Sequence, residues 1–216
     1  MTIHAPVPNY AAARRLMVES QLRPQGVTDA GVLEAMGAVE RETFAPAEAR
    51  ALAYADRSLA LGGGRYLCAP AAIAQLLTQL APVPGERALV VGAATGYSAA
   101  LLARVGLNVT AVESDPGLAA QARALGIAVV EGNLDRGHKA EAPYELILID
   151  GAIEHVPAAI VDQLADGGRL GTALIERGIT RLIVGRKTGG AFGYLSINDA
   201  GVPALPGFSR PPTFTF

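Results

Sequence analysis

The sequence predicts an α/β fold, in which a doubly wound, mostly parallel sheet of seven strands follows extra N-terminal helices. From residue 87 onward short apolar runs alternate with helical segments, and strands in such an alternation form parallel sheets with helices on both faces. Apolar residues fill 50% of the 216 positions and charged residues 18%, which is typical of a folded globular chain. A chain of this length is most simply one structural domain.

The sequence pattern of the first eighty residues predicts helices. Three of these helices begin at residues that favour N-termini, namely Asn9, Thr28 or Asp29, and Pro70. The spacing of Ala12, Leu16 and Met17 places these apolar residues on one face of the first helix. We therefore divide the single domain into an N-terminal helical extension with a binding loop (residues 1–80) and a core (residues 81–216).

Residues 57–68 interrupt the helical pattern and predict a loop. Three consecutive glycines, at positions 62–64, permit positive φ angles and a close approach of the backbone to a ligand. This composition is typical of a binding loop, and a flexible surface loop is the alternative.

The second part of the chain predicts the strands of the sheet. The expected strands are 87–92, 107–113, 127–132, 144–150, 169–175, 181–186 and 192–197. Asp115 and Pro116 are a cap and a first-turn proline for one of the intervening helices. No helix separates the closing strands, so we expect at least one of them to run antiparallel.

A nucleotide site is expected beyond the carboxyl ends of these strands, where the strand order reverses. Gly92 ends the first strand and permits a sharp turn, and the small residues Ala94 and Gly96 keep side chains away from a ligand. Glu113 ends the second strand, and its carboxylate can accept both hydroxyls of a ribose. The spacing lacks the third glycine of dinucleotide binders, so a ligand without phosphates, most commonly S-adenosylmethionine, fits better. An empty Rossmann-like shell is the alternative.

Composition excludes several other classes. The formal net charge is −2 without a basic block, and no apolar stretch is long enough for a bilayer, so we expect neither nucleic acid nor membrane as a partner. A lone cysteine, Cys68, and the absence of a secretory signal indicate the cytoplasm. We predict no metal site, and a homodimer is possible. The apolar tail at 211–216 could dock on the body or on a partner subunit, or fray.

A series of short motifs runs along most of the chain. In the N-terminal part they are Arg15–Val18, Gln21-Leu22, Val32–Met36, Arg41–Pro46, Ala53–Asp56, Leu59, Gly62 and Gly64. In the core they are Gly92–Tyr97, Gly132, Gly137 and Ala142–Glu145. In order and spacing these motifs resemble the protein-L-isoaspartate O-methyltransferase family, from about residue 14 to residue 185.

This resemblance implies a Rossmann-like class I methyltransferase with S-adenosyl-L-methionine as cofactor and S-adenosyl-L-homocysteine as product. The family methylates the side-chain α-carboxylate of L-isoaspartyl residues in damaged proteins or peptides, and the ester closes to a succinimide from which normal aspartate can re-form. A carboxylate is already a nucleophile, so the reaction needs aligned reactants in a water-poor site more than a strong base.

The resemblance also implies roles for particular residues. The cofactor would contact Gly92, Ala94, Gly96, Tyr97, Glu113, Ser114, Asn133, Leu134 and Asp150. The substrate loop would contain Leu61, Gly62, Gly64, Arg65 and Tyr66. The implied catalytic residues are Cys68 and Asp56.

Departures from the family pattern cluster at this predicted site. Where the family has Thr-Ile-Ser, this chain has Tyr66-Leu67-Cys68, and where the family has Asp-Gly, it has Asn133-Leu134. Val90 stands in place of an acidic residue, and Ala94 in place of a glycine. Asp150 stands in place of a small neutral residue. They leave two alternatives open: a divergent methyltransferase for another acceptor, and a non-catalytic adenosyl-binding module.

Four of the candidate residues also have plainer interpretations. Cys68 could replace the serine or be a small buried hydrophobe, since a thiol is a weaker hydrogen-bond donor than a hydroxyl. Asp150 could orient the substrate, bind a metal or cap a helix. Tyr66 could contact the sulfonium or merely cover the loop. Arg65 could pair with a substrate carboxylate or be an exposed charge.

Overall fold

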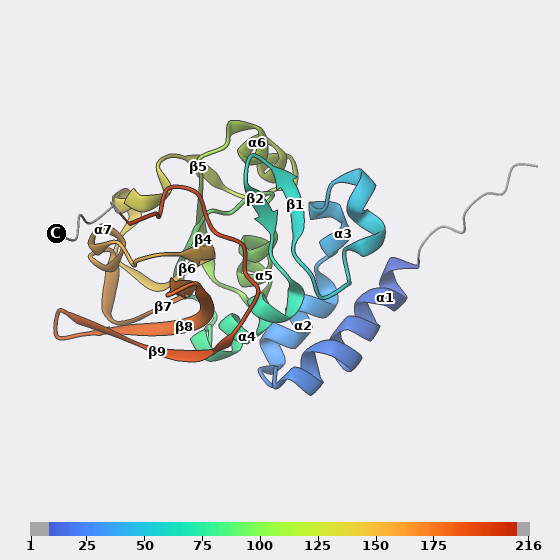
Figure 1. Cartoon of the computed structure of the whole chain (residues 1–216), viewed down its shortest axis with the longest axis horizontal. Helices are drawn as coiled ribbons and strands as arrows, with labels where there is room; N and C mark the ends of the chain where they lie inside the picture. The colour runs from blue at the N-terminus through green and yellow to red at the C-terminus, as the bar shows by residue number, and fades with distance from the viewer. Residues whose placement is uncertain (1–8, 211–216) are drawn as a thin grey trace, which may run out of the picture.

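The computed structural model describes residues 9–210 and contains the predicted seven-stranded sheet (Figure 1). The strand order is β5-β4-β3-β6-β7-β8-β9. The bounds are β3 Arg87–Val91, β4 Asn108–Glu113, β5 Val129–Glu131, β6 Tyr144–Ile153, β7 Leu164–Glu176, β8 Ile179–Thr188 and β9 Ala191–Asp199. The pairs from β5 to β7 are parallel, whereas β8 and β9 run antiparallel to their neighbours. The predicted fold class is confirmed.

The strand order reverses at β3. From β3 the chain builds outward through β4 and β5, and then returns to the other side of β3 with β6 and β7. The carboxyl ends of β3, β4 and β6 therefore meet at one edge of the sheet, the position at which doubly wound folds bind ligands.

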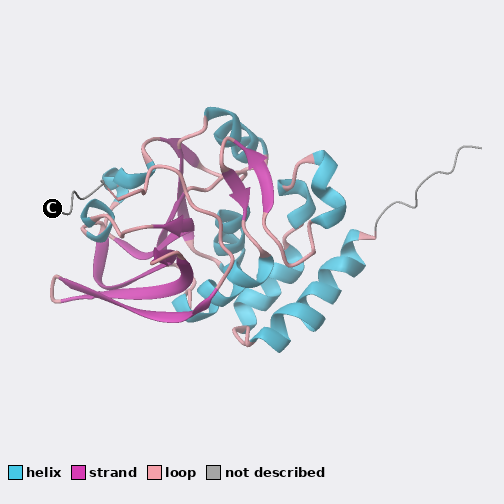
Figure 2. Cartoon of the chain, in the orientation of Figure 1, coloured by secondary structure: helices cyan, strands magenta, loops and turns pink. Residues whose placement is uncertain are grey.

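Helices surround the sheet (Figure 2). The α-helices are α1 Tyr10–Met17, α2 Ala30–Ala38, α3 Arg41–Phe44, α4 Pro70–Leu80, α5 Tyr97–Val105, α6 Pro116–Ala124 and α7 Ala158–Val161. A π-helical turn covers Val18–Leu22, and short 3-10 turns cover Arg23–Gln25, Ala47–Leu52, Leu134–Arg136 and Lys139–Glu141. No helix of the described residues is both long and apolar enough to cross a membrane.

Apolar side chains on alternate strand positions form a core on each face of the sheet. Along β3, Ala88 and Val90 belong to one cluster, and Leu89 and Val91 to the other, as the two-residue period of a strand requires. Helices α4, α5 and α6 contribute to the first cluster, and α2 packs in turn on α4 and α5. Helix α7 and the C-terminal segment contribute to the second.

Capping residues set the starts of the N-terminal helices as predicted. The Asn9 side chain accepts a hydrogen bond from the Ala12 backbone N–H at 3.0 Å, and Asp29, rather than Thr28, accepts one from Val32 at 2.9 Å. Pro70 is the first residue of α4.

The predicted apolar face of the first helix is wrong at Leu16, which is 62% exposed. Arg14 is buried in its place, because its guanidinium donates to the Tyr54 hydroxyl at 2.8 Å and to Glu42 at 3.0 Å. Helical periodicity predicts apolar residues at buried positions, but a charged side chain can also be buried when it is paired and hydrogen-bonded.

The predicted glycine loop is a β-hairpin. Its strands are β1 (Leu59–Gly62) and β2 (Arg65–Leu67), which pair antiparallel from Leu59 opposite Leu67. The three glycines have positive φ angles of 94°, 56° and 74°, and Gly63 and Gly64 form the turn between the strands. We call residues 59–67 the β1–β2 hairpin.

The chain after β9 crosses the carboxyl edge of the sheet, and we call residues 200–210 the C-terminal strap. In Figure 1 the strap is the red segment that runs back from the end of β9 across the molecule. Ala152, near the end of β6, donates to the Pro203 carbonyl at 2.9 Å and accepts from the Leu205 N–H at 2.7 Å. Strand β6 runs beyond its predicted end at Asp150, because Ala152 and Ile153 also pair with Ala173 and Leu174 of β7.

Candidate functional site

The turn after β3 has the sharp backbone predicted for it. Gly92 adopts a φ of +76° and Ala94 a φ of +51°, a left-handed conformation that glycine adopts without strain and alanine does not. Gly96, at the N-terminus of α5, also has a packing reason to be small, and its predicted role of leaving space for a ligand stays a prediction. A β-carbon there would lie 2.8 Å from the Ile127 side chain, so glycine at this position allows α5 to pack closely.

The Glu113 carboxylate lies at the end of β4 and is fully buried. It accepts backbone N–H bonds from Ala94 at 2.7 Å, Ser114 at 2.7 Å and Asp115 at 3.0 Å. Burial by itself would raise its pKa, but the guanidinium of Arg65 and these N–H donors outweigh burial and lower the pKa of Glu113 below its ordinary value. The group is therefore a carboxylate at neutral pH.

Arg65, on β2, forms an ion pair with Glu113. Its Nη2 lies 2.7 Å from Oε2 and its Nε 3.3 Å from Oε1, and the arginine side chain is only 4% exposed. The predicted alternative of an exposed charge is therefore wrong for Arg65, and pairing with a substrate carboxylate stays a prediction. The hairpin brings β2 over the end of β4, a contact between residues 48 positions apart that no local pattern reveals.

Leu205, on the C-terminal strap, covers the same turn and was not identified from the sequence. A β-carbon at Gly92 would lie 3.0 Å from Leu205 Cδ1 and 3.1 Å from Arg65 Nη2. A β-carbon at Gly151 would lie 2.9 Å from Leu205 Cβ. Glycines at 92 and 151 thus leave room that the chain itself fills with an apolar side chain and a guanidinium.

A second buried group adjoins the ion pair. The Asp150 carboxylate accepts the Ser98 hydroxyl at 2.5 Å and neighbours the Cys68 thiol, and its Oδ1 has no hydrogen-bond partner within residues 9–210. Burial raises the pKa of Asp150, although the hydrogen bonds and the charges of Arg65 and Arg41 oppose the rise. The structure thus brings Cys68 and Asp150 together, at one edge with Glu113.

Arg41, at the start of α3, holds this region to the N-terminal helices. Its side chain is completely buried, and it donates to the Ala53 carbonyl at 2.7 Å and to the Cys68 carbonyl at 2.6 Å. Its guanidinium lies 4.8 Å from the centre of the Tyr97 ring. The sequence offers Arg41 only as part of a family-like stretch, with no sign of burial.

Tyr97, predicted to contact the cofactor, is 1% exposed. Besides the guanidinium of Arg41, its ring meets Phe44 edge-on at 5.5 Å. Its hydroxyl has no hydrogen-bond partner in the described part of the chain. In this structure Tyr97 joins α5 to the N-terminal helices, and its contact with a ligand stays a prediction.

The remaining predicted residues take varied places. Asp56 is exposed, accepts the Ala71 N–H at 3.1 Å and so caps α4, which is a structural contact. Ser114 and Asn133 are exposed at the ends of β4 and β5, whereas Leu134 is 4% exposed and packs in the second core cluster. The other hairpin residues, Leu61, Gly62, Gly64 and Tyr66, flank Arg65, and Tyr66 is half-buried.

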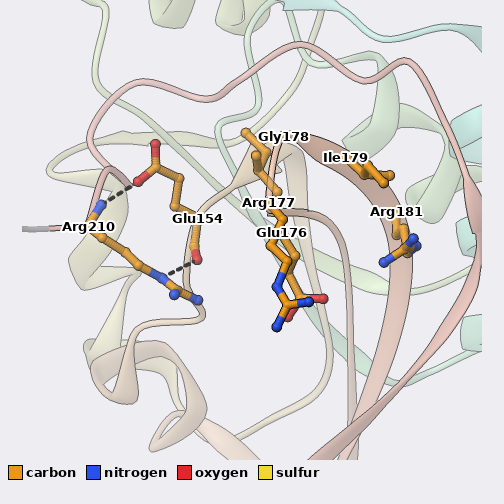
Figure 3. Close-up of a pocket in the computed structure, with 8 residues that line it drawn as sticks. Glu154, Glu176, Arg177, Gly178, Ile179, Arg181 and Arg210 are labelled. Atoms are coloured by element: carbon orange, nitrogen blue, oxygen red, sulfur yellow. Dashed lines mark hydrogen bonds between the residues drawn. The ribbon is translucent and has the colours of Figure 1, made fainter.

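A hollow of about 670 Å³ lies elsewhere, over the turn between β7 and β8 (Figure 3). Glu154 and Glu176 face Arg177, Arg181 and Arg210 around it, so its acidic and basic groups largely balance. Glu154 is already engaged, because its carboxylate accepts the Arg210 backbone N–H and its backbone carbonyl accepts Arg210 Nε–H. None of the predicted site residues lines this hollow, and the chemistry of the site lies at the Glu113 edge.

Cys68 is expected to be unreactive in the folded protein. Its side chain is 3% exposed, and burial together with the neighbouring Asp150 carboxylate raises the pKa of the thiol well above its ordinary value. We expect native protein at pH 8 to react with a disulfide reagent on the order of a hundredfold more slowly than unfolded protein. The unfolded chain, with its one cysteine, should consume one equivalent. Prompt labelling of the native protein would show an accessible thiolate instead.

Comparisons with known proteins agree with the fold. A family model described as protein-L-isoaspartate(D-aspartate) O-methyltransferase matches residues 13–192. A protein-L-isoaspartate O-methyltransferase of Methylorubrum populi is 46% identical over 165 residues, which cover 74% of this chain and 78% of that protein. One of Aeropyrum pernix is 44% identical over 173 residues, covering 74% of this chain and 66% of that protein.

Two solved structures of protein-L-isoaspartate O-methyltransferases have the same fold as this chain. A Plasmodium falciparum protein-L-isoaspartate O-methyltransferase in complex with S-adenosyl-L-homocysteine superimposes with a TM-score of 0.79, at 21% identity, over 93% of this chain and 100% of that chain. A second protein-L-isoaspartate O-methyltransferase gives a TM-score of 0.77 at 22% identity, over 90% of this chain and 67% of that chain.

Proposed function

Because the chain belongs to the protein-L-isoaspartate O-methyltransferase family, we propose that it methylates the α-carboxylate of L-isoaspartyl residues in damaged proteins or peptides, with S-adenosyl-L-methionine as cofactor. The observation that carries the proposal for this chain is Glu113, a buried carboxylate at the end of β4 that faces the turn after β3. A ribose presents two hydroxyl donors, and an ionised carboxylate at this edge is the acceptor that suits them.

The residues of the site fit an adenosyl group once two side chains have moved. Gly92 leaves space over the turn, Glu113 is ionised, and Ser114 and Asn133 are exposed beside it. That space is filled by Arg65 and by Leu205, the two side chains that would have to leave. When bound, the cofactor would supply a methyl group on a sulfonium, which an acceptor carboxylate can attack without prior deprotonation.

The chain's own contribution is to bind, align and exclude water. The β1–β2 hairpin and the C-terminal strap cover the carboxyl edge, so a bound acceptor would be shielded from solvent. Cys68 would form part of the wall of the site as a neutral thiol. The raised pKa of this thiol does not favour a role as nucleophile. We propose no chemical step for Asp56, whose carboxylate caps α4.

A second candidate is methyl transfer to an acceptor other than an isoaspartyl carboxylate, and Asp150 favours it. The resemblance implies a small neutral residue at this position, and the buried Asp150 carboxylate in its ionised form would repel an anionic acceptor. A phenol or another neutral acceptor would avoid that repulsion.

Transfer of labelled methyl from S-adenosylmethionine to an isoaspartyl peptide tests the proposal, with the matching aspartyl peptide as control. We expect label on the isoaspartyl peptide alone. No transfer to it, together with binding of S-adenosylhomocysteine, would overturn isoaspartyl methylation and direct the search to other acceptors. The cytoplasm as location and a homodimer as assembly stay predictions, which fractionation and sedimentation would check.

A further inference from the structure

The ion pair between Arg65 and Glu113 occupies the atoms that a ribose would need. The guanidinium meets both carboxylate oxygens, at 2.7 Å and 3.3 Å, and the two side chains are 4% and 0% exposed. The other donors to Glu113 are three backbone N–H groups of the surrounding turns and the Ser114 hydroxyl at 3.3 Å. A ligand can therefore reach the Glu113 oxygens only when Arg65 leaves them.

Leu205 occupies the adjoining space over Gly92, and the two elements that carry Arg65 and Leu205 touch each other. A β-carbon at Gly64, in the hairpin turn, would lie 3.4 Å from Pro206 Cγ of the strap. Figure 1 shows β1 and β2 beside this red segment. The hairpin and the strap thus close the ligand space together.

The exchange of partners at Glu113 costs binding free energy. The guanidinium makes two charge-assisted hydrogen bonds to Glu113, and its positive charge attracts the carboxylate in a site from which water is excluded. The ribose hydroxyls would also make charge-assisted hydrogen bonds to this carboxylate, but as neutral donors they lack the Coulomb attraction of the guanidinium that they replace. Affinity for an adenosyl ligand must then be lower than it would be with a neutral residue at position 65.

We propose that Arg65 sets the affinity of this site for its adenosyl ligand, by holding Glu113 in the free protein and releasing it when the ribose binds. The inference rests on the proposed function only in taking Glu113 as the ribose acceptor. Arg65 is a positioning residue in this account, because it acts on the ligand through Glu113.

Release of Arg65 requires only a local change. The β1–β2 hairpin has strands of four and three residues, and an isolated two-stranded hairpin is marginally stable. The buried Arg41 guanidinium anchors its far end through the Cys68 carbonyl, so the glycine turn can lift while that end stays in place.

Titration calorimetry with S-adenosylhomocysteine tests the proposal on wild type, R65Q and the control R57Q. Arg57 precedes the same hairpin but is exposed and forms no ion pair within residues 9–210, so R57Q removes an equal charge without touching Glu113. We expect R65Q to bind at least about tenfold more tightly than wild type, and R57Q to stay within about twofold.

Three outcomes separate the proposals. Tighter binding by R65Q supports the role of Arg65, including the case in which wild type binds too weakly to measure. Equal or weaker binding by R65Q, with wild type binding, overturns the role of Arg65 and leaves the cofactor site intact. No binding by any of the three overturns both the cofactor site and the role of Arg65.

The wild-type chain provides a test that does not depend on the folding of R65Q. With ¹⁵N-labelled arginine, the Nε–H of Arg65 should be protected from hydrogen exchange in the free protein, because it is buried and bonded to Glu113. Saturation with S-adenosylhomocysteine should increase its exchange rate at least about tenfold. Unchanged exchange in a protein that has bound the ligand would overturn the proposal.

Discussion

Glu113→Ala is expected to lower the free energy of unfolding by about 3–5 kcal/mol and to abolish binding of S-adenosylhomocysteine. The substitution leaves the guanidinium of Arg65 buried without its ionic partner, and it also leaves the Ala94 N–H without its acceptor. Urea denaturation measures the first effect, and calorimetry the second.

A double-mutant cycle with Arg65→Gln is the control for this prediction. Arg65→Gln alone should lower the free energy of unfolding by less than Glu113→Ala does, because Glu113 keeps three backbone N–H donors. The double variant should be more stable than the sum of the single effects predicts, by at least about 1.5 kcal/mol. Purely additive effects would contradict a coupled ion pair.

The contribution of Glu113 should also depend on pH. The pKa of its carboxyl is lower in the folded protein than its ordinary value of 4.5. Such a group stabilises the fold fully above its unfolded pKa, and loses that contribution as the pH falls through the folded pKa. The stability difference between wild type and Glu113→Ala should therefore be constant near neutral pH and shrink below about pH 4.5. A difference that grows on acidification would contradict this account.

Arg41→Met is expected to lower the free energy of unfolding by about 3 kcal/mol or more. The change leaves the buried carbonyls of Ala53 and Cys68 without their donor, at about 1–3 kcal/mol each, and removes the guanidinium from the Tyr97 ring. Thermal and urea unfolding of the variant measure the loss.

Arg50→Met is the matched control for Arg41→Met. Arg50 lies on the same N-terminal segment but is exposed, and its substitution should change stability by no more than about 0.5 kcal/mol. If Arg41→Met were as stable as Arg50→Met, Arg41 would not be the anchor that the structure indicates.

The sheet could be predicted from the sequence because its signals are local. Apolar runs, Gly92 after the first strand and Glu113 after the second each report a strand or its end within a few residues. The rule that parallel strands share a carboxyl edge then places Gly92 and Glu113 together, as the structure does through the Ala94 N–H.

The contents of the site could not be predicted, because they come from distant segments. The partner of Glu113 depends on how the β1–β2 hairpin folds over β4, and Leu205 reaches Gly92 only through the path of the C-terminal strap. Arg41 looks like a surface residue in the sequence, since burial of a charge depends on partners that spacing does not reveal. Residues 211–216, for which a docked or frayed tail is predicted, lie outside the described residues.

The most direct test of the account is the crystal structure of the chain with S-adenosylhomocysteine, because it shows which group Glu113 holds. We predict the ribose hydroxyls on the Glu113 carboxylate, and Arg65 Nη2 beyond hydrogen-bond distance of Oε2, from which it lies 2.7 Å in the ion pair described above. A ligand bound elsewhere, or bound at this edge with the ion pair intact, would contradict it.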